Sequence, residues 1–202
     1  CDLEGDMNVA GRELHLRDER YRVLIVPAAE VVPYDTLAKV RAFFDAGGVV
    51  VGYGMLPSKS ATLGKTSEDV AALRTAIWGE ADAPGLEVCQ TNAAGGRAYF
   101  LPEKPTSEQL QQVLTGDAGI RPTLEVLEGE TDDWLHVLHR VKAGSDVFFI
   151  TNLHHDGPTK QFRLRARAAG VPECWDALRG EIRALSHERA GGDAVEFSLT
   201  LE

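Results

Sequence analysis

The chain has 202 residues, of which 44% are hydrophobic and 26% are charged, and its formal net charge at pH 7 is −10. This length is enough to bury one large core or two small ones, but a complete (β/α)8 barrel needs about 250 residues by itself. The 31 acidic residues outnumber the 21 basic ones. Because nucleic-acid binding needs a basic surface that attracts phosphates, we expect no nucleic-acid partner.

Cysteine usage and hydropathy leave the cellular compartment open. Three cysteines, Cys1, Cys89 and Cys174, give no disulfide framework, and their odd number favours neither an oxidising nor a reducing compartment. We find no signal-peptide pattern and no apolar run long enough to span a membrane, and we therefore expect no membrane partner. The start at Cys1 rather than Met indicates a piece cut from a longer protein. The alternative is a mature lipoprotein that begins at an acylated Cys.

The first block of the sequence alternates strand and helix patterns. Residues 22–26 form a short apolar run, which is typical of a buried strand. Asp35 is expected to cap a helix over residues 35–46, and a pair of glycines ends it. Further strands are expected at 49–53, 86–89 and 97–101, and further helices begin near Ser67 and at Thr106 or Ser107.

Strands that alternate with helices predict a mostly parallel sheet between two helical layers. We therefore expect residues 1–118 to form a three-layer α/β domain of the flavodoxin-like or amidotransferase-like kind.

The second block contains strand patterns alone. The expected strands cover residues 123–127, 135–141, 147–153, 161–167, 181–185 and 195–201. Turns rich in Gly, Asp and Pro separate these strands. Several short strands at this spacing predict an antiparallel β-sandwich, which we place at residues 119–202.

Side chains that follow one another on a strand point to opposite faces. Of Phe148 and Phe149, one is therefore expected to face the sandwich core, while the other faces a neighbouring domain. Arg163, Arg165 and Arg167 alternate in the same way and are expected to share one solvated face. The alternative is that these arginines meet an anionic sugar or an acidic neighbouring domain.

Several short motifs in the two blocks, taken in chain order, resemble those of a known protein family. In the second block they are His139-Arg140, Asn152 at the end of a strand, and Trp175-Asp176 followed by Gly180. In the first block they are residues 21–27 (Tyr-Arg-Val-Leu-Ile-Val-Pro), Thr36-Leu37 and Gly47-Gly48. Together they resemble the C-terminal, non-catalytic region of α-L-rhamnosidase-like enzymes of glycoside hydrolase family 106, roughly from Asp2 to Leu185.

The resemblance implies an accessory piece of a rhamnosidase-like glycoside hydrolase. Such a piece would support a catalytic barrel or shape one wall of its sugar cleft. Its partner would be the missing catalytic domain of the same polypeptide, and the parent enzyme would be periplasmic or secreted. We expect no catalytic residue and no cofactor in this piece. Two alternatives stay open, namely a carbohydrate-binding module that acts by itself and a small-molecule enzyme that uses the α/β sheet.

Trp134 and Trp175 are the candidate carbohydrate contacts, because an exposed indole can stack on the apolar face of a sugar ring. A glycan is therefore a candidate partner. Packing of the indole into the core is the other interpretation, and from the sequence we favour it for both residues.

His154, His155 and Asp156 are the candidate metal ligands, since imidazole and carboxylate groups both bind zinc. Neighbouring residues of a strand point apart, so the two histidines could share an ion only where the chain turns. We favour an exposed polar hairpin tip and expect no bound metal.

Other patterns give weaker signals. Gly52-Tyr53-Gly54 follows a strand, but a dinucleotide site also needs a helix N-terminus directly after the glycines, and the sequence predicts none. Cys89 lacks the small neighbours of a nucleophile elbow, so we expect a buried thiol. The acidic residues 128–133 are expected to form a solvated loop and not a calcium site or a glycosidase pair.

Overall fold

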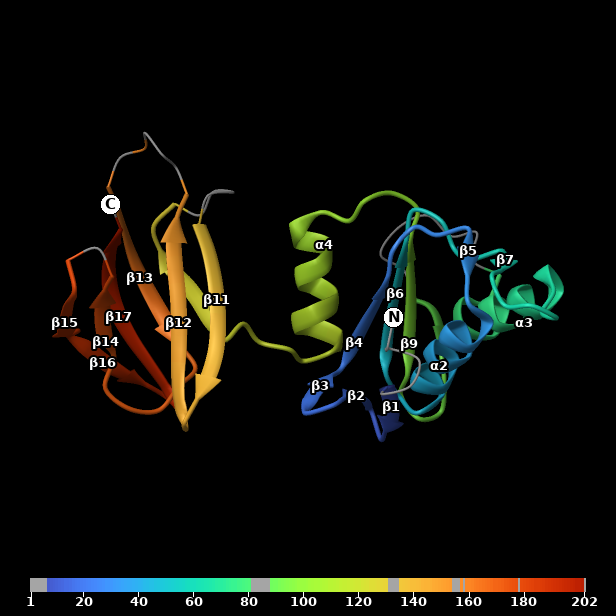
Figure 1. Ribbon diagram of the computed structural model, residues 1–202, viewed down its shortest axis with the longest axis horizontal. Helices are drawn as coiled ribbons and strands as arrows, with labels where there is room; N and C mark the ends of the chain where they lie inside the picture. Colours follow the sequence, from blue (N-terminus) through green and yellow to red (C-terminus); the bar gives the residue numbers. More distant parts are fainter. Residues whose placement is uncertain are drawn as a thin grey trace. The chain divides into compact units, whose positions relative to one another are not determined.

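The computed structural model describes residues 7–80, 88–130, 135–153, 157, 159–177 and 179–201. The chain divides into two compact units between Arg121 and Pro122. Helices and a mixed sheet make up the first unit, and antiparallel sheets make up the second (Figure 1). This is the expected fold class, an α/β part followed by a β part. That residues 1–118 and 119–202 are separate folding domains stays a prediction.

The sheet at the centre of the first unit has the strand order β4-β6-β9-β8. Strands β4 (Val23–Val26), β6 (Val49–Tyr53) and β9 (Arg97–Leu101) run parallel. Strand β8 (Val88–Thr91) is antiparallel to β9. The parallel part follows from the apolar runs in the sequence, since strands covered on both faces carry few polar side chains.

Helices cover both faces of this sheet. Helices α2 (Tyr34–Asp45) and α3 (Ser67–Trp78) lie on one side of it, and α4 (Ser107–Gln111), which continues into the π-helical segment η1 (Gln112–Asp117), lies on the other (Figure 1). The three layers that the alternating pattern predicts are therefore present.

Strand β6 links the two cores of the first unit. Val50 belongs to the core formed with α2 and α3, which also contains Phe43 and Trp78. Val49 and Val51, which point the other way, belong to a second core with Tyr99 and Leu101 of β9 and Val113 of the opposite helical layer. Alternation along one strand thus holds the three layers together.

The helix starts agree with the sequence in two cases out of three. Thr66 caps α3 and Thr106 caps α4, and each hydroxyl accepts a hydrogen bond from the backbone N–H of the third helical residue. The expected Asp35 cap is wrong. Pro33 holds the cap position of α2 without a side-chain bond, and Asp35 lies in the first turn, where its charge favours the helix dipole.

Two small sheets of the first unit were not expected from the sequence. The strands β1 (Met7–Ala10), β2 (Glu13–Leu16) and β3 (Glu19–Tyr21) form an antiparallel sheet. Strands β5 (Val31–Val32) and β7 (Lys59–Ser60) pair in parallel. All five strands are too short to produce a clear period-two pattern.

The second unit contains a four-stranded antiparallel sheet and two hairpins. The sheet has the order β10 (Leu124–Glu128), β13 (Lys160–Ala166), β17 (Ala194–Leu201) and β16 (His187–Ala190). One hairpin joins β11 (Leu135–Lys142) to β12 (Ser145–Asn152). The other joins β14 (Glu173–Asp176) to β15 (Glu181–Ala184). Strands β14 and β16 were missed by the sequence analysis.

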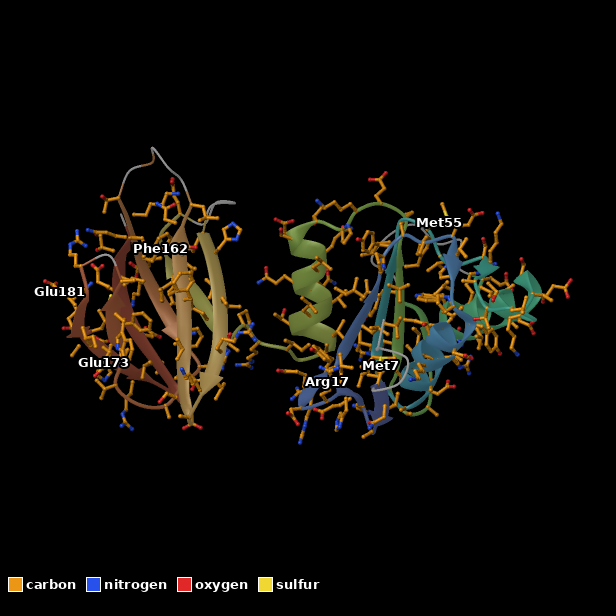
Figure 2. All side chains as sticks on the ribbon, in the orientation of Figure 1. Met7, Arg17, Met55, Phe162, Glu173 and Glu181 are labelled. Carbon is orange, nitrogen blue, oxygen red and sulfur yellow. The ribbon has the colours of Figure 1, made fainter. Side chains whose placement is uncertain are left out.

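The core of this unit lies between the sheet and the hairpins. Phe162 and Leu164 of β13 and Phe197 of β17 are buried, and Phe148 of β12 and Cys174 of β14 pack against them. Figure 2 shows Phe162 among the side chains of this unit.

Of the two neighbouring rings, Phe148 contacts the core, whereas Phe149 is 60% exposed. The expectation that they point to opposite faces is confirmed.

The other face of the four-stranded sheet carries a ladder of ion pairs. Arg165 of β13 donates hydrogen bonds to Glu196 of β17 (2.7 Å from Nη2 to Oε1) and to Glu125 of β10 (3.1 Å from Nη1 to Oε2). Arg167 also bonds to Glu125 at 2.7 Å, and Arg163 bonds to Glu196 at 2.9 Å. The arginines share one face as expected, but carboxylates of the adjacent strands pair with them.

These ion pairs change the acidity of both carboxylates. The hydrogen bond from Arg167 lowers the pKa of Glu125 from its usual value, and partial burial opposes this effect. The hydrogen bonds from Arg165 and Arg163 lower the pKa of Glu196 in the same way. Both groups therefore stay ionised at neutral pH and hold three strands together through charge as well as through the backbone ladder.

The first prediction concerns the two rings of β12. Phe148→Ala is expected to cost about 3 kcal/mol of unfolding free energy, the low end for a Phe truncation because the ring is only partly buried. Phe149→Ala is expected to cost less than about 0.5 kcal/mol in the isolated chain, because its ring lies in solvent. Urea unfolding of both variants provides the measurement. Equal losses would contradict the assignment of inner and outer faces.

The second prediction concerns pH. Because the folded pKa values of Glu125 and Glu196 lie below the ordinary value of 4.5, their ion pairs stabilise the folded state fully above that pH. This stabilisation is lost as the pH falls below 4.5 through the folded pKa values. Urea unfolding between pH 7 and pH 3 should therefore show a steeper loss for the natural chain than for Glu196→Gln.

Glu188→Gln is the matched control, since Glu188 lies 3.8 Å from Arg163 but is 83% exposed. Its pH profile should follow that of the natural chain. A Glu196→Gln profile that matches the natural one as well would show that the ladder contributes nothing to the pH dependence.

Candidate functional site

Most of the candidate residues named from the sequence lie outside the described residues. Trp134 is one of them, and so are His154, His155 and Asp156. Trp175 is described, and it lies on the hairpin β14–β15 of the second unit.

Within the described parts of the chain, no three His, Cys, Asp or Glu side chains gather so that they could hold a metal ion. Over the same residues, every helix is too short or too polar to cross a lipid bilayer.

The outer face of the hairpin β14–β15 presents Trp175. Its direct cross-strand partner is Ile182, and both side chains are largely exposed, at 72% and 61%. Cys174, the neighbour of Trp175 on the same strand, points the other way and packs against the core. Core packing, which the sequence favoured for Trp175, is therefore wrong: alternation along β14 places the thiol inside and the indole outside.

Polar contacts hold the indole and the turn in place. The Glu173 carboxylate accepts a hydrogen bond from the indole N–H of Trp175, with 3.1 Å between Nε1 and Oε2. Asp176 accepts two hydrogen bonds from Arg179 in the turn, one from the backbone N–H at 3.0 Å and one from the guanidinium at 2.7 Å. In Figure 2, the labels of Glu173 and Glu181 mark this hairpin.

A second uncovered apolar surface lies on the outer face of the hairpin β11–β12. Leu138 and Phe149 are direct cross-strand partners, and Val147 lies two residues before Phe149 on the same face. All three side chains are exposed. We call these three residues the β12 apolar face.

On the inner face of this hairpin, the contacts of His139 account for one motif of the family resemblance, His139-Arg140. The His139 ring stacks on Phe148 with 4.4 Å between the ring centroids and 8° between the planes. Its Nε2 lies 2.8 Å from Oδ1 of Asp146. The imidazole thus fixes the register of β11 against β12.

Gly52 and Gly54 have structural roles at the end of β6. A Cβ atom at Gly52 would lie 2.5 Å from the Leu56 side chain and 3.3 Å from the Trp78 ring. Trp78 is fully buried, and its indole N–H donates to the carbonyl of Tyr99 at 3.0 Å. Gly54 has a φ of +72°, which favours glycine. Close packing and a turn account for both glycines without a bound phosphate.

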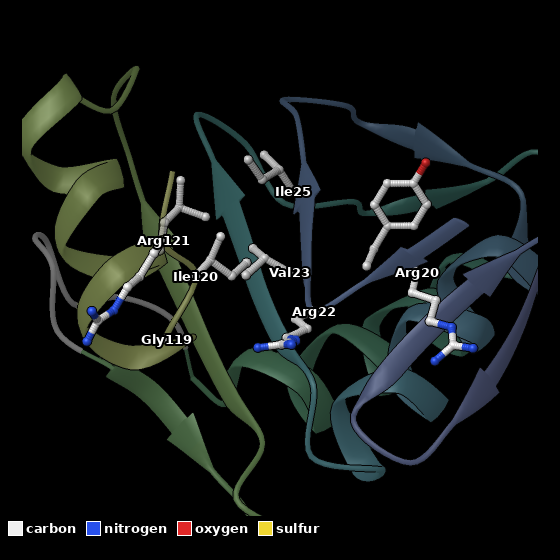
Figure 3. Close-up of a pocket in the computed structure, with 9 residues that line it drawn as sticks. Arg20, Arg22, Val23, Ile25, Gly119, Ile120 and Arg121 are labelled. Atoms are coloured by element: carbon white, nitrogen blue, oxygen red, sulfur yellow. The ribbon is translucent and has the colours of Figure 1, made fainter. Parts of the chain in front are cut away.

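A shallow depression of about 430 Å³ lies beside the edge strand β4 (Figure 3). Its lining comes from two distant segments, which the sequence analysis did not connect. The residues are Arg20, Tyr21, Arg22, Val23, Ile25, Leu114, Gly119, Ile120 and Arg121. Arginines surround an apolar floor, and one of them, Arg22, is paired with Glu13 at 3.5 Å.

Three solved structures that share the fold of this chain are glycosidases. The rhamnosidase from Novosphingobium sp. PP1Y superposes with a TM-score of 0.72 at 18% identity, over 99% of this chain and 18% of that one. A catalytic mutant of a GH42 β-galactosidase from G. stearothermophilus has a TM-score of 0.51 at 16% identity, over 89% and 32%. A β-galactosidase from Bacillus circulans sp. alkalophilus has a TM-score of 0.51 at 17% identity, over 88% and 33%.

At these identities the likeness concerns the fold alone, and the chain spans less than a fifth of the length of the solved rhamnosidase. No curated protein sequence matches the chain. The family model described as alpha-L-rhamnosidase, glycoside hydrolase family 106, matches residues 3–189, nearly the entire chain. The chain therefore belongs to glycoside hydrolase family 106.

Proposed function

We propose that this chain is an accessory, non-catalytic part of a family 106 rhamnosidase, which packs against the catalytic barrel of the same polypeptide. There it supports the barrel or forms one wall of its sugar cleft. The observation that supports this most is the coverage: 99% of this chain aligns with only 18% of the solved rhamnosidase. A catalytic barrel of about 250 residues has room in the remainder of that protein but not in a chain of 202 residues.

Four carboxylates of the described residues are unsuited to act as the proton donor of a glycosidase. Glycoside hydrolysis needs one carboxyl group whose pKa is raised, so that it can donate a proton, and a second carboxylate across the sugar. Glu125 and Glu196 instead have lowered pKa values, because arginines donate hydrogen bonds to them. The pKa values of Asp69 and Glu108 are lowered as well, by hydrogen bonds at helix N-termini. Groups held in the ionised form are poor proton donors.

The β12 apolar face is the surface we assign to contact with the remaining polypeptide. The outer face of the four-stranded sheet bears paired charges and is suited to water. Leu138, Val147 and Phe149 instead expose hydrocarbon on neighbouring positions of one small sheet. Exposed apolar side chains that adjoin one another are typical of surfaces that another protein part covers.

A carbohydrate-binding module that acts by itself is the second candidate, and the exposed indole of Trp175 favours it. A small-molecule enzyme on the α/β sheet has less support, because packing and turn geometry account for Gly52 and Gly54 at the carboxyl end of β6.

The third prediction tests the proposed role. The isolated chain should not hydrolyse an aryl α-L-rhamnoside, whereas a longer polypeptide that includes the barrel should. In the longer polypeptide, Phe149→Ser should cost about 2 kcal/mol of stability, since it removes a ring that contact with the barrel would bury. In the isolated chain the same change should leave the unfolding free energy nearly unchanged.

Leu63→Ser is the control for this experiment, because Leu63 is a fully exposed apolar residue of the first unit. It should change neither protein. Turnover by the purified isolated chain that disappears on a single Asp or Glu substitution would contradict the proposal. An equal effect of Phe149→Ser in both proteins would show that the β12 apolar face does not contact the barrel.

A further inference from the structure

Two tryptophans of the described residues lie in opposite environments. Trp78 is fully buried, and its N–H bonds to a backbone carbonyl in the core. Trp175 is 72% exposed, and its N–H bonds to the surface carboxylate of Glu173. A large aromatic side chain gains most from burial, so one that is held in water by polar contacts indicates a surface that something else covers.

The indole of Trp175 is held in one orientation. The hydrogen bond to Glu173 at 3.1 Å restrains the plane of the ring, and both residues lie on the same face of β14. Beneath the indole, Cys174 anchors the strand to the core. The two hydrogen bonds between Asp176 and Arg179 close the turn. A platform that is already rigid loses little conformational entropy when a ligand binds.

The small size of this surface distinguishes between kinds of ligand. Its apolar part consists of Trp175 and Ile182, whose Cβ atoms, as direct cross-strand partners, lie about 5 Å apart. A stable protein complex covers roughly 800 Å² on each side, so a protein partner would have to extend well beyond these two side chains. A nucleic acid would bring phosphates towards the carboxylate of Glu173 in a chain with a net charge of −10. A single sugar ring fits the available surface.

The chemistry of the three side chains favours a particular class of sugar. An indole accepts the apolar C–H face of a pyranose ring. Of the Glu173 carboxylate, Oε2 bonds to the indole, and among the described residues Oε1 has no hydrogen-bond partner, so it can accept from a sugar hydroxyl. Ile182 extends the apolar surface beside the indole, where a methyl substituent gains contact and a hydroxymethyl group would lose hydration.

We propose that the outer face of the hairpin β14–β15 is a binding site for one 6-deoxyhexose residue, such as a rhamnosyl group. Trp175 stacks on the ring, Glu173 accepts a hydrogen bond from a hydroxyl group, and Ile182 contacts the methyl group at C6. Methyl α-L-rhamnopyranoside serves as the probe, because rhamnose is a 6-deoxyhexose. The site itself is independent of the catalytic barrel, so the isolated chain is sufficient for its test.

The fourth prediction is tested by titrating the isolated chain with methyl α-L-rhamnopyranoside. The indole N–H signals in NMR spectra report the binding. The Trp175 signal, assigned with the Trp175→Phe variant, should shift with a dissociation constant of about 1 mM, which is typical of one stacked ring with few hydrogen bonds. The signal of the buried Trp78 should stay in place. Methyl α-L-mannopyranoside, which differs by a hydroxyl group at C6, should bind several-fold more weakly.

Three variants separate the roles of the side chains. Trp175→Ala should weaken rhamnoside binding by about tenfold or more without changing the unfolding free energy, because the ring is exposed. Ile182→Thr should remove the preference for the rhamnoside over the mannoside. Phe149→Ala changes a ring on the other hairpin that is also largely exposed, and it should leave sugar binding unchanged.

Failure of the proposal has distinct signatures. A Trp175 signal that does not move at saturating sugar, or equal binding by Trp175→Ala, would overturn it. Self-association of the chain that Trp175→Ala abolishes would also overturn it, since the face would then be a protein contact. Turnover of the aryl rhamnoside by the isolated chain bears on the accessory role alone and leaves this site unaffected.

Discussion

Every sheet of the second unit has one face against the core, and the state of the opposite face distinguishes the parts of this unit. On the four-stranded sheet, that face is occupied by arginines and glutamates that neutralise one another across three strands. On the two hairpins it carries exposed hydrocarbon, at Phe149 in one case and at Trp175 in the other. Both proposals follow from this contrast. Paired charges cover the outer face of the four-stranded sheet, whereas apolar side chains remain exposed on the outer faces of the two hairpins.

In the first unit, by contrast, the central parallel strand β6 has a core on each of its two faces. Val49, Val50 and Val51 alternate between two separate cores, so both faces of the sheet are covered at β6, and a ligand could reach the sheet there only at the strand ends. At the carboxyl end of β6 the space is filled, since Leu56 and Trp78 close over Gly52. The depression beside β4 is open but shallow. The solved structures that share the fold of this chain are named for different sugars, a rhamnosidase and two β-galactosidases, so the fold alone carries little information about substrate.

The sequence was sufficient for elements whose signal is local. Apolar runs predicted β4 and β6, Ser67 indicated the start of α3, and Thr106 or Ser107 indicated that of α4, because strand periodicity and caps are properties of neighbouring residues. Asp35 failed as a cap since Ser, Thr, Asp and Asn are also favoured within the first turn for their charge or hydrogen bonding. Partners of the arginine ladder could not be predicted, because the register that brings Glu125 and Glu196 to Arg165 joins strands far apart in sequence. For the same reason the exposure of Trp175 could not be predicted, because it depends on which side of β14 meets the core.

The arginine ladder has a consequence for how the second unit responds to heat and salt. Hydration of charged groups becomes less favourable as temperature rises, so the cost of bringing the carboxylates and guanidinium groups together decreases on heating. The hydrophobic stabilisation by the apolar core on the opposite face of the same sheet reaches a plateau at high temperature. Added salt acts in the reverse sense, since it screens exposed ion pairs while sulfate or phosphate strengthens burial of hydrocarbon. One sheet is therefore stabilised from its two faces by forces that respond to salt in opposite ways, and its pairing tolerates a wider range of salt concentrations than either force alone would allow.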